Sequence, residues 1–417
     1  MKRLLSAALA GCALIGAAHA QSGIGAALLT REEAIARALD DDPGIRAAAE
    51  SVRAAEATAA QAGLRPNPSV DLQLEDFGGS GPFSGVDAAQ ATYSLAQKVE
   101  LGGDRRARRR LADKETEISR VRADLSALDL KEAVEIAFAE AQAARAFADL
   151  ASARLKIARE FSAAVDRRVS AARDPLAAKA RVSAQLAEAE IEAGAAEGRA
   201  RSAVERLASF WGGSADFNVE TATLEQTAAR PARQASPPDL ALAAAEQGSA
   251  EARLDIERAR RVPDPEFRAG FRQLQETDGS AFIVGVSVPL PIWNRNSGAL
   301  AAARADQARA GYEAEARARA LDREIAYYAA EADRARLQAE TYAAKVIPHS
   351  EEALQQSFDG YSQGGLSYLE VLEAQSALAD ARERRVGALL TLRRAEARLA
   401  RRGAAAAGAS TTEENDQ

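Results

Sequence analysis

The segment Val70-Asp71-Leu72-Gln73-Leu74-Glu75 alternates apolar and polar side chains without interruption. A period of two is that of a β-strand whose two faces meet different surroundings. Three later segments repeat this alternation, and a loop containing Gly and Ser joins the members of each pair. We therefore predict four strands, at about residues 68–77, 88–99, 265–275 and 281–290.

Charged and amide side chains occupy one face of these strands, at Asp71, Gln73, Glu75, Arg268 and Arg272. Two hairpins on a soluble core are an alternative, but they do not account for charges on a face turned to that core. The pattern favours a membrane wall with its apolar face toward lipid and these five residues toward a wet lumen. Four strands cannot enclose a lumen, and an open sheet edge in lipid leaves backbone groups unpaired. We therefore predict a homotrimer whose sheets close a barrel of about 12 strands.

The chain consists of two similar halves. Pro66-Asn67-Pro68 and Pro263-Asp264-Pro265 each follow a helical segment and precede a strand pair. A long helical tract follows each strand pair, then turns and returns as a second helix, and Pro348 is expected to kink its tract. The predicted fold is mostly α with a small β part, in two tandem repeats of helix, strand, strand, long helix and helix. In the trimer, the helical hairpins would continue the β-barrel as a periplasmic α-helical barrel.

The expected domain boundaries follow from changes in composition along the chain. We place the first repeat at residues 21–210 and the second at 239–402. The stretch between them, 211–238, is rich in Gly, Ser and Pro and is predicted to be a linker. Residues 403–417 are small and polar and are predicted to be a disordered tail.

The first 20 residues are predicted to be a secretory signal peptide. Lys2 and Arg3 precede an apolar stretch that ends in Ala18-His19-Ala20, where Ala18 and Ala20 form a cleavage site. As an alternative, the lipoprotein-like box ending at Cys12 could receive acyl chains that anchor the chain to a membrane. Either reading predicts export from the cytoplasm.

The composition argues against several classes of function. The formal net charge of −7 disfavours a nucleic-acid partner. Signal-peptide removal would take away the only Cys and the only Met, leaving a single histidine, His349. No cofactor and no bound metal are therefore expected. The chain has no catalytic constellation and no glycine-rich phosphate loop, so we predict that it is not an enzyme.

One charged run has several possible roles. Arg105, Arg106, Arg108, Arg109 and Arg110 stand at the start of the first long helix, where the helix dipole disfavours cations. They could face the lumen, anionic groups at the membrane surface, or solvent.

Two sets of motifs resemble those of a known family. Gly360-Tyr361-Ser362 with Gly364, followed by residues 369–374, is similar to a hairpin turn of the outer-membrane efflux proteins, the TolC-like outer membrane factors. Residues 97–106 and 288–298 resemble the strand-to-helix junctions of the heavy-metal, CzcC-like branch. The resemblance covers nearly all of the mature chain.

The resemblance implies a passive exit duct in the outer membrane of a Gram-negative cell, with a long periplasmic extension. The implied partners are a periplasmic membrane-fusion adaptor, an inner-membrane pump of the resistance-nodulation-division type and the lipid bilayer. The implied cargo is divalent heavy-metal cations. The same duct for drugs, other organic compounds or type I protein secretion stays an alternative, as does a periplasmic coiled-coil adaptor or scaffold.

The resemblance also assigns roles at the periplasmic end. Glu370 and Glu373 lie on one helix face and would line the entrance with rings of carboxylates. Tyr361 would hold the closed entrance by a hydrogen bond, but Leu176 stands where its acidic partner is expected. The hairpin tips are expected to contact the adaptor, through Arg173, Asp174, Pro175, Gly364, Gly365 and Leu366.

Overall fold

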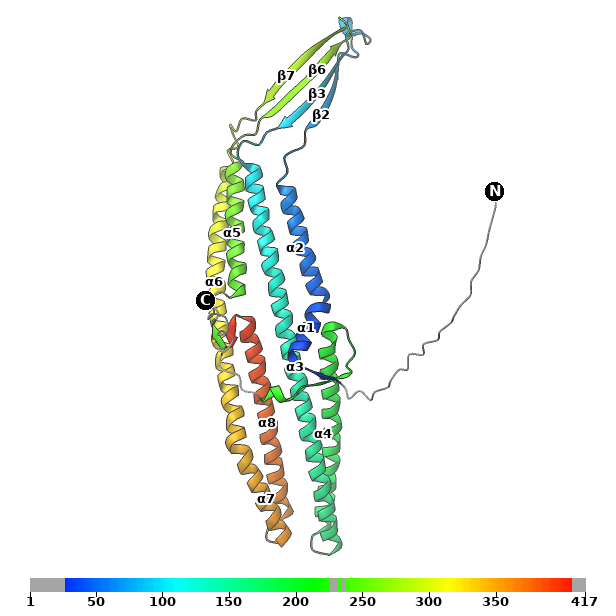
Figure 1. Ribbon diagram of the computed structural model, residues 1–417, viewed down its shortest axis with the longest axis vertical. Helices are drawn as coiled ribbons and strands as arrows, with labels where there is room; N and C mark the ends of the chain where they lie inside the picture. The colour runs from blue at the N-terminus through cyan, green and yellow to red at the C-terminus, as the bar shows by residue number, and fades with distance from the viewer. Residues whose placement is uncertain (1–26, 226–230, 234–236, 407–417) are drawn as a thin grey trace, which may run out of the picture.

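The computed structural model describes residues 27–225, 231–233 and 237–406. The molecule is elongated, with a small sheet at one end and two helical hairpin tips at the other (Figure 1). Both candidate processing sites, the pair Ala18 and Ala20 and the residue Cys12, lie outside the described residues. Within the described residues, no helix has both the length and the apolar character required to cross a membrane.

Four antiparallel strands form the sheet, and they lie where the alternation predicts them. They are β2 (Ser69–Glu75), β3 (Gln90–Lys98), β6 (Glu266–Leu274) and β7 (Gly279–Ser287). The strand order is β2-β3-β6-β7, so the pairing of β3 with β6 joins the two repeats. Strands β2 and β7 are the two edges of this sheet.

The register places the predicted polar residues on one face. Asp71 lies opposite Ser94, and Gln73 lies opposite Thr92, which in turn faces Arg272. Arg272 forms an ion pair with Glu75 at 3.0 Å. Thr92 on this face is only 7% exposed.

The opposite face of the sheet is apolar and open. Phe282 is 94% exposed, and Val70 and Val284 are nearly as exposed. Burial is therefore inverted relative to a soluble sheet, which covers its apolar face. This inversion argues against two ordinary hairpins on a soluble core.

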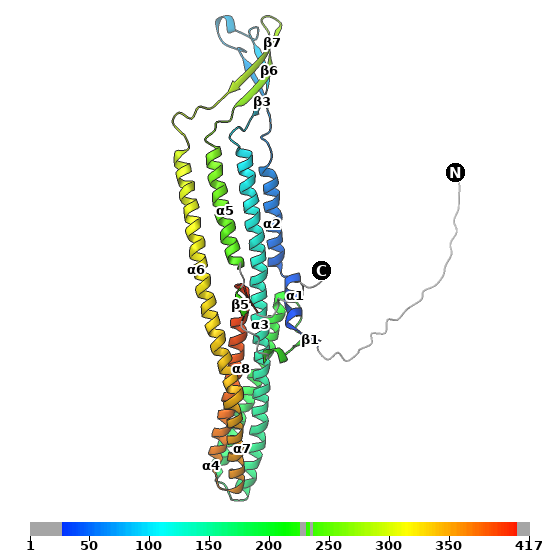
Figure 2. The ribbon, with the colours of Figure 1, turned by 60° about the vertical axis from the view of Figure 1, so that its left-hand side comes forward.

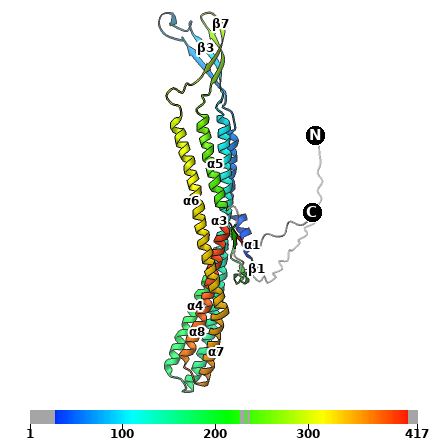
Figure 3. The same cartoon turned by 90° about the vertical axis from the view of Figure 1, so that its left-hand side faces the viewer.

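Long helices run from the sheet to the tips (Figures 2 and 3). The longest, α3, has 67 residues, which corresponds to about 100 Å. Helices α2 and α4 pack on α3 one after the other, and α5 and α8 pack between α3 and α6. The helices are α1 (Arg31–Asp41), α2 (Pro43–Ala62), α3 (Asp104–Ser170), α4 (Leu176–Ala208), α5 (Pro238–Ala259), α6 (Ser297–Thr341), α7 (Ile347–Gln363) and α8 (Tyr368–Arg401).

Short elements gather beside the middle of the helices. Strand β1 (Ala27–Leu29) pairs in parallel with β4 (Phe217–Val219), and β5 (Pro231–Arg233) pairs with β8 (Ala404–Ala406). Single turns of 3₁₀-helix occur here at Ser209–Trp211 and Ala222–Leu224, and a third, Gly81–Phe83, lies in the loop between β2 and β3 at the sheet end. The predicted linker and tail thus contain short structured elements. Three-residue strands are too short to show an alternation, so no sequence pattern predicted them.

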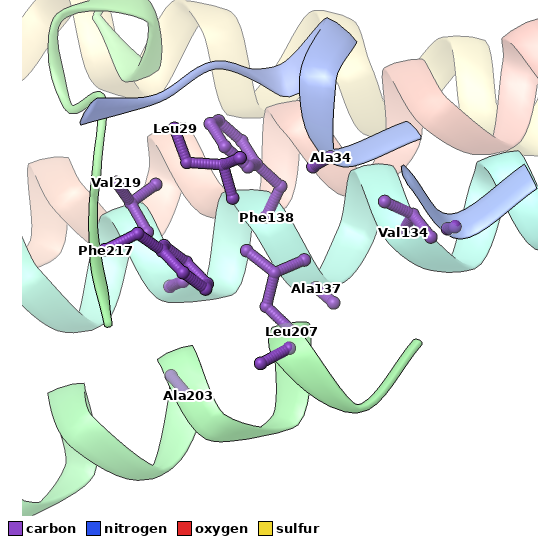
Figure 4. Close-up of a cluster of buried hydrophobic side chains, with 12 residues drawn as sticks. Leu29, Ala34, Val134, Ala137, Phe138, Ala203, Leu207, Phe217 and Val219 are labelled. Carbon is purple, nitrogen blue, oxygen red and sulfur yellow. The ribbon is translucent and has the colours of Figure 1, made fainter. Parts of the chain in front are cut away.

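The largest apolar cluster holds this middle region together. Leu29 from β1 and Phe217 from β4 pack with Phe138 of α3 and Leu207 of α4 (Figure 4). Small alanines such as Ala34 and Ala137 fill the remaining contacts and let the helices approach closely. The cluster therefore fixes α1, α3 and α4 of the first repeat to one another.

A buried carboxylate joins the two repeats at the same level. Asp239, at the start of α5, is 6% exposed and binds Arg317 of α6 and Arg401 of α8. Arg401 also binds Asp129 of α3. Breaking a buried pair of this kind costs about 3–5 kcal/mol, so this network resists separation of α3 from α5, α6 and α8.

The helix around Pro348 adapts locally to the missing backbone N–H. A π-helical turn at Tyr342–Val346 joins α6 to α7, and Pro348 stands in the first turn of α7. Proline has no backbone N–H and cannot donate the hydrogen bond of an interior α-helical residue. The extra residue of the π turn accommodates this loss. The predicted kink thus takes the form of a π turn.

The two tips turn through left-handed residues of different type. At the second tip this residue is Gly364, with φ of 83°. At the first tip it is Ala172, with φ of 55°. A left-handed conformation costs an alanine about 1 kcal/mol more than a glycine.

We therefore expect Ala172→Gly to stabilise the protein by roughly 0.5–1 kcal/mol. Thermal unfolding of the purified protein would measure the gain as a higher Tm. The control is Ala171→Gly, because Ala171 has an ordinary φ of −86° and glycine there should lower the Tm. A Tm that falls in both variants would contradict the assigned strain.

Candidate functional site

Side chains at the two tips form a compact cluster between the helical hairpins. Phe161 and Val165 of α3 and Val182 of α4 pack against Tyr361 of α7 and Val371 of α8. Tyr361 is 4% exposed, and its ring lies 5.7 Å from that of Phe161. One hairpin from each repeat thus contributes to the same core.

Tyr361 has an acidic partner, which is Asp174. The hydroxyl of Tyr361, on the second hairpin, donates to Oδ2 of Asp174, in the turn of the first hairpin, at 2.7 Å. Burial, and next the hydrogen bond to Asp174, raises the pKa of Tyr361 to about 12. The hydroxyl is therefore a donor throughout the physiological pH range. Leu176, where the resemblance led us to expect the acid, is exposed.

Arg168 of α3 completes this arrangement. Its guanidinium donates to both oxygens of Asp174, at 3.0 and 3.3 Å, and to the backbone oxygen of Tyr361 at 3.1 Å. It also lies 4.4 Å from the centre of the Tyr361 ring, within cation–π distance. The hydrogen bonds from Arg168, and then that from Tyr361, lower the pKa of Asp174. We call Arg168, Asp174 and Tyr361 the tip latch.

A second contact between the hairpins lies close to the tip latch. Arg181 of α4 donates to the hydroxyl of Tyr368, at the start of α8, at 2.9 Å. Above the tips, the hairpins are separated by a cavity of about 120 Å³, whose lining includes Arg154, Glu188, Arg382 and Glu383. The lining also includes apolar side chains such as Leu150 and Leu378, and it extends to Phe161 and Val182 of the tip cluster.

The predicted gate carboxylates are both exposed, but they differ in their contacts. Glu370 accepts hydrogen bonds from the backbone N–H of Ser367 at 2.6 Å and from its hydroxyl at 3.0 Å. This is a capping box, in which Glu370 stabilises the first turn of α8. In the described chain Glu373 has no ion-pair partner. Glu370 therefore has a structural role that the sequence analysis did not assign.

The tip residues expected to meet an adaptor are mostly accessible. Arg173, Pro175, Gly364, Gly365 and Leu366 are exposed. The carboxylate of Asp174 is 11% exposed and belongs to the tip latch. Its environment suits a contact within the chain better than one with a partner.

No sequence pattern assigned a role to Arg168, Arg181 or Tyr368. Arg168 belongs to no motif, and its two partners, Asp174 and Tyr361, come one from each hairpin. Among the described residues, no group of three or more His, Cys, Asp or Glu side chains could hold a metal ion.

Known proteins similar to this chain share both its sequence profile and its architecture. The profile of the family described as Outer membrane efflux protein matches residues 34–213 and 231–402. This chain belongs to that family. Family members are efflux channels and not enzymes.

Curated relatives place this efflux protein on the predicted CzcC-like branch. The cobalt-zinc-cadmium resistance protein CzcC of Cupriavidus metallidurans is 29% identical over 373 residues, which cover 87% of this chain and 86% of CzcC. The nickel and cobalt resistance protein CnrC of the same species is 30% identical over 266 residues, 63% of each chain.

Solved structures confirm the predicted TolC-like fold of this efflux protein. It superposes on CusC with a TM-score of 0.75 at 17% identity, covering 88% of this chain and 90% of CusC. It superposes on VceC of Vibrio cholerae with a TM-score of 0.74 at 18% identity, covering 90% of this chain and 96% of VceC.

The lowered pKa of Asp174 gives the efflux protein a pH-dependent tip. Because the pKa is lower in the folded protein than in the unfolded chain, the carboxylate stabilises the tip at neutral pH. This contribution is lost as the pH falls through the folded-state pKa. We expect Asp174→Asn to cost about 1–3 kcal/mol at neutral pH and progressively less below about pH 4.

Thermal unfolding of the wild type and of Asp174→Asn across this pH range would measure the difference. Asp359→Asn, which removes an exposed carboxylate on α7, is the control and should show little difference at any pH. A wild-type advantage that does not change with pH would rule out the ionised form of Asp174 as its source.

Proposed function

We propose that three copies of this chain form an outer-membrane duct for divalent heavy-metal cations in a Gram-negative cell. The duct would be the exit component of a tripartite system with a periplasmic membrane-fusion adaptor and an inner-membrane resistance-nodulation-division pump. The observation that carries the proposal is the four-stranded sheet, whose apolar face is exposed and whose charged face is partly covered. The domain boundaries of the sequence analysis, including the signal peptide, are part of the same proposal.

Closure of the sheet requires further strands. Unpaired backbone groups in lipid cost several kcal/mol each, and β2 and β7 present a row of them. In a homotrimer, β7 of one copy would pair with β2 of the next and complete a barrel of about 12 strands. Asp71, Gln73, Glu75, Arg268 and Arg272 would then face its lumen.

Cation preference would arise at the periplasmic entrance and not in the barrel. In the barrel, Asp71 and Glu75 offset the charges of Arg268 and Arg272. At the tips, Glu370 and Glu373 would form two rings of carboxylates in the trimer. The names of CzcC and CnrC, which are resistance proteins for divalent metals, support this choice of cargo.

The tip latch would hold the entrance closed. Tyr361 and Arg168 together fix Asp174, and hydrogen bonds to a charged group contribute about 1.5–3 kcal/mol each. An adaptor that binds the exposed tip residues better when the hairpins separate would shift the equilibrium toward the open state. The chain itself supplies no energy source, so the pump would drive transport.

Deletion of the gene should make the cell sensitive to divalent metals. We expect reduced growth on zinc, cobalt or cadmium, with copper tested beside them, and restoration by the wild-type gene. A panel of dyes tests the alternative of a duct for organic compounds. Sensitivity to dyes alone would overturn the proposed cargo.

Replacing both gate carboxylates should weaken cation selectivity. Glu370→Gln with Glu373→Gln keeps the capping box, because glutamine also accepts the hydrogen bonds of Ser367. Planar-bilayer recordings should show a cation-to-anion permeability ratio that falls toward one. The matched control, Glu251→Gln with Glu340→Gln, removes the same charge from exposed positions away from the tips. An unchanged ratio in the gate variant would remove these residues from the mechanism.

A further inference from the structure

We propose that a basic hollow between α3 and α5 binds the phosphate of an anionic phospholipid in the periplasmic leaflet of the outer membrane. Arg106 and Arg110 of α3 and Arg258 of α5 line it, together with Asp255, and Gly102 and Gly103 form its rim. Its volume is about 590 Å³. The proposal rests on the proposed function, because it requires the sheet to lie in the membrane.

Positive charge exceeds negative charge in this basic hollow. Asp255 accepts from Arg110 at 2.7 Å and from Arg258 at 3.0 Å. Arg106 is exposed, and in the described chain it has no ion-pair partner. One carboxylate thus faces three guanidinium groups, in a protein whose formal net charge is −7. Arginine binds phosphate through two parallel N–H donors, so the uncompensated charge suits a phosphate ligand.

The basic hollow opens on the side of α3 that continues the apolar face of the sheet. Arg106 and Arg110 are four residues apart and share one helix face, whereas Arg108 between them points the other way. Arg108 binds Glu100 in a separate cleft that also contains Lys98. Lys98 lies on the polar face of β3, as the alternation with Thr92 and Ser94 shows. That cleft therefore belongs to the lumen side, and the basic hollow to the outer side.

Mostly apolar side chains lead from the sheet to the rim of the basic hollow. Tyr93, Leu95, Val99 and Leu101 lie along the outer side and are all exposed, and Gln97 between them donates to the backbone oxygen of Pro66. Val99 still pairs with the neighbouring strand, through its N–H to the oxygen of Pro265 at 2.9 Å. A lipid whose acyl chains lie on this apolar stripe would place its headgroup at Gly102 and beyond.

The rim leaves room for a headgroup. Gly103, with φ of 81°, has open space where a side chain would stand. A Cβ on Gly102 would come within 2.5 Å of the backbone oxygen of Ala259, so the connection before α3 lies against the end of α5 and leaves the open space at Gly103.

A tryptophan marks the same level on the next connection. Trp293, between β7 and α6, is 93% exposed (Figure 2 shows this connection beside the one between α5 and β6). Tryptophan is enriched where hydrocarbon meets headgroups. Its position supports a membrane boundary at the height of the basic hollow.

A neighbouring copy of the chain would not cover the basic hollow. Below the sheet the helices pack in the order α2, α3, α5 and α6, so the basic hollow lies between the two central helices. Copies that join through β2 and β7 would meet along α2 and α6. The surface at Arg106 and Arg258 would therefore remain open to lipid.

The test measures lipid binding to the full-length, detergent-purified protein by native mass spectrometry. The probes are dioleoyl-phosphatidylglycerol, dioleoyl-phosphatidylcholine and, as a soluble phosphate, glycerol phosphate. An arginine near a membrane surface contributes roughly fivefold to the affinity for anionic lipid. We expect the wild type to bind phosphatidylglycerol in preference to phosphatidylcholine. The triple variant Arg106→Gln with Arg110→Gln and Arg258→Gln should bind phosphatidylglycerol at least about tenfold more weakly than the wild type does.

The control variant is Arg159→Gln with Arg199→Gln and Arg201→Gln. It removes the same charge from exposed sites on α3 and α4 away from the sheet, and it should bind phosphatidylglycerol as the wild type does. If the triple variant does not fold, Arg106→Gln alone removes no ion pair of the described chain and should weaken lipid binding several-fold. Equal binding of both lipids, unchanged binding by the Arg106 variants, or equal affinity for glycerol phosphate would overturn the proposal.

Oligomeric state and channel conductance, measured on the same samples, separate the two proposals. Stable oligomers that conduct but show no preference for phosphatidylglycerol would contradict the lipid site alone. A wild-type protein that stays monomeric and soluble without detergent would contradict the proposed function itself.

Discussion

The backbone hydrogen bonds of the two edge strands are the constraint on which the remaining structure depends. β2 and β7 end a sheet of four strands, and their outward N–H and C=O groups need partners wherever water is absent. The exposed apolar face at Phe282 suits a lipid environment, from which water is absent. In the proposed trimer, copies of the same sheet would supply matching edges, and closure, the polar lumen and the ring of helices below would all follow from this one requirement.

Rigidity is distributed unevenly along the helices. At the middle, Asp239 and Arg401 tie α3 to α5, α6 and α8 through buried ion pairs, and the cluster around Phe138 fixes the first repeat. Toward the tips, a cavity with both polar and apolar lining separates the two hairpins, and the tip latch joins them below it. The apolar cluster around Tyr361 and the contact of Arg181 with Tyr368 join the hairpins there as well.

The charged residues also differ between the sheet, the junction below it and the tips. The polar face of the sheet combines acidic and basic groups, such as Glu75 with Arg272. The junction beneath it presents excess arginine on its outer side, and the tips present exposed carboxylates. An acidic protein with such an arrangement could attract cations at its entrance while its outer surface meets phosphate at the membrane.

The sequence alone determined the four strands, their two faces, the duplication and the positions of the tips. Each of these features follows from local alternation, the placement of glycine or a repeated motif. Tertiary structure alone decided that Asp174 is the partner of Tyr361, 187 residues away, and that Arg168 binds both. It also decided that Glu370 caps α8, whereas Glu373 makes no ion pair in the described chain. The physical reason is that side-chain patterns report the surroundings a segment needs, whereas pairing between distant residues depends on how whole helices pack.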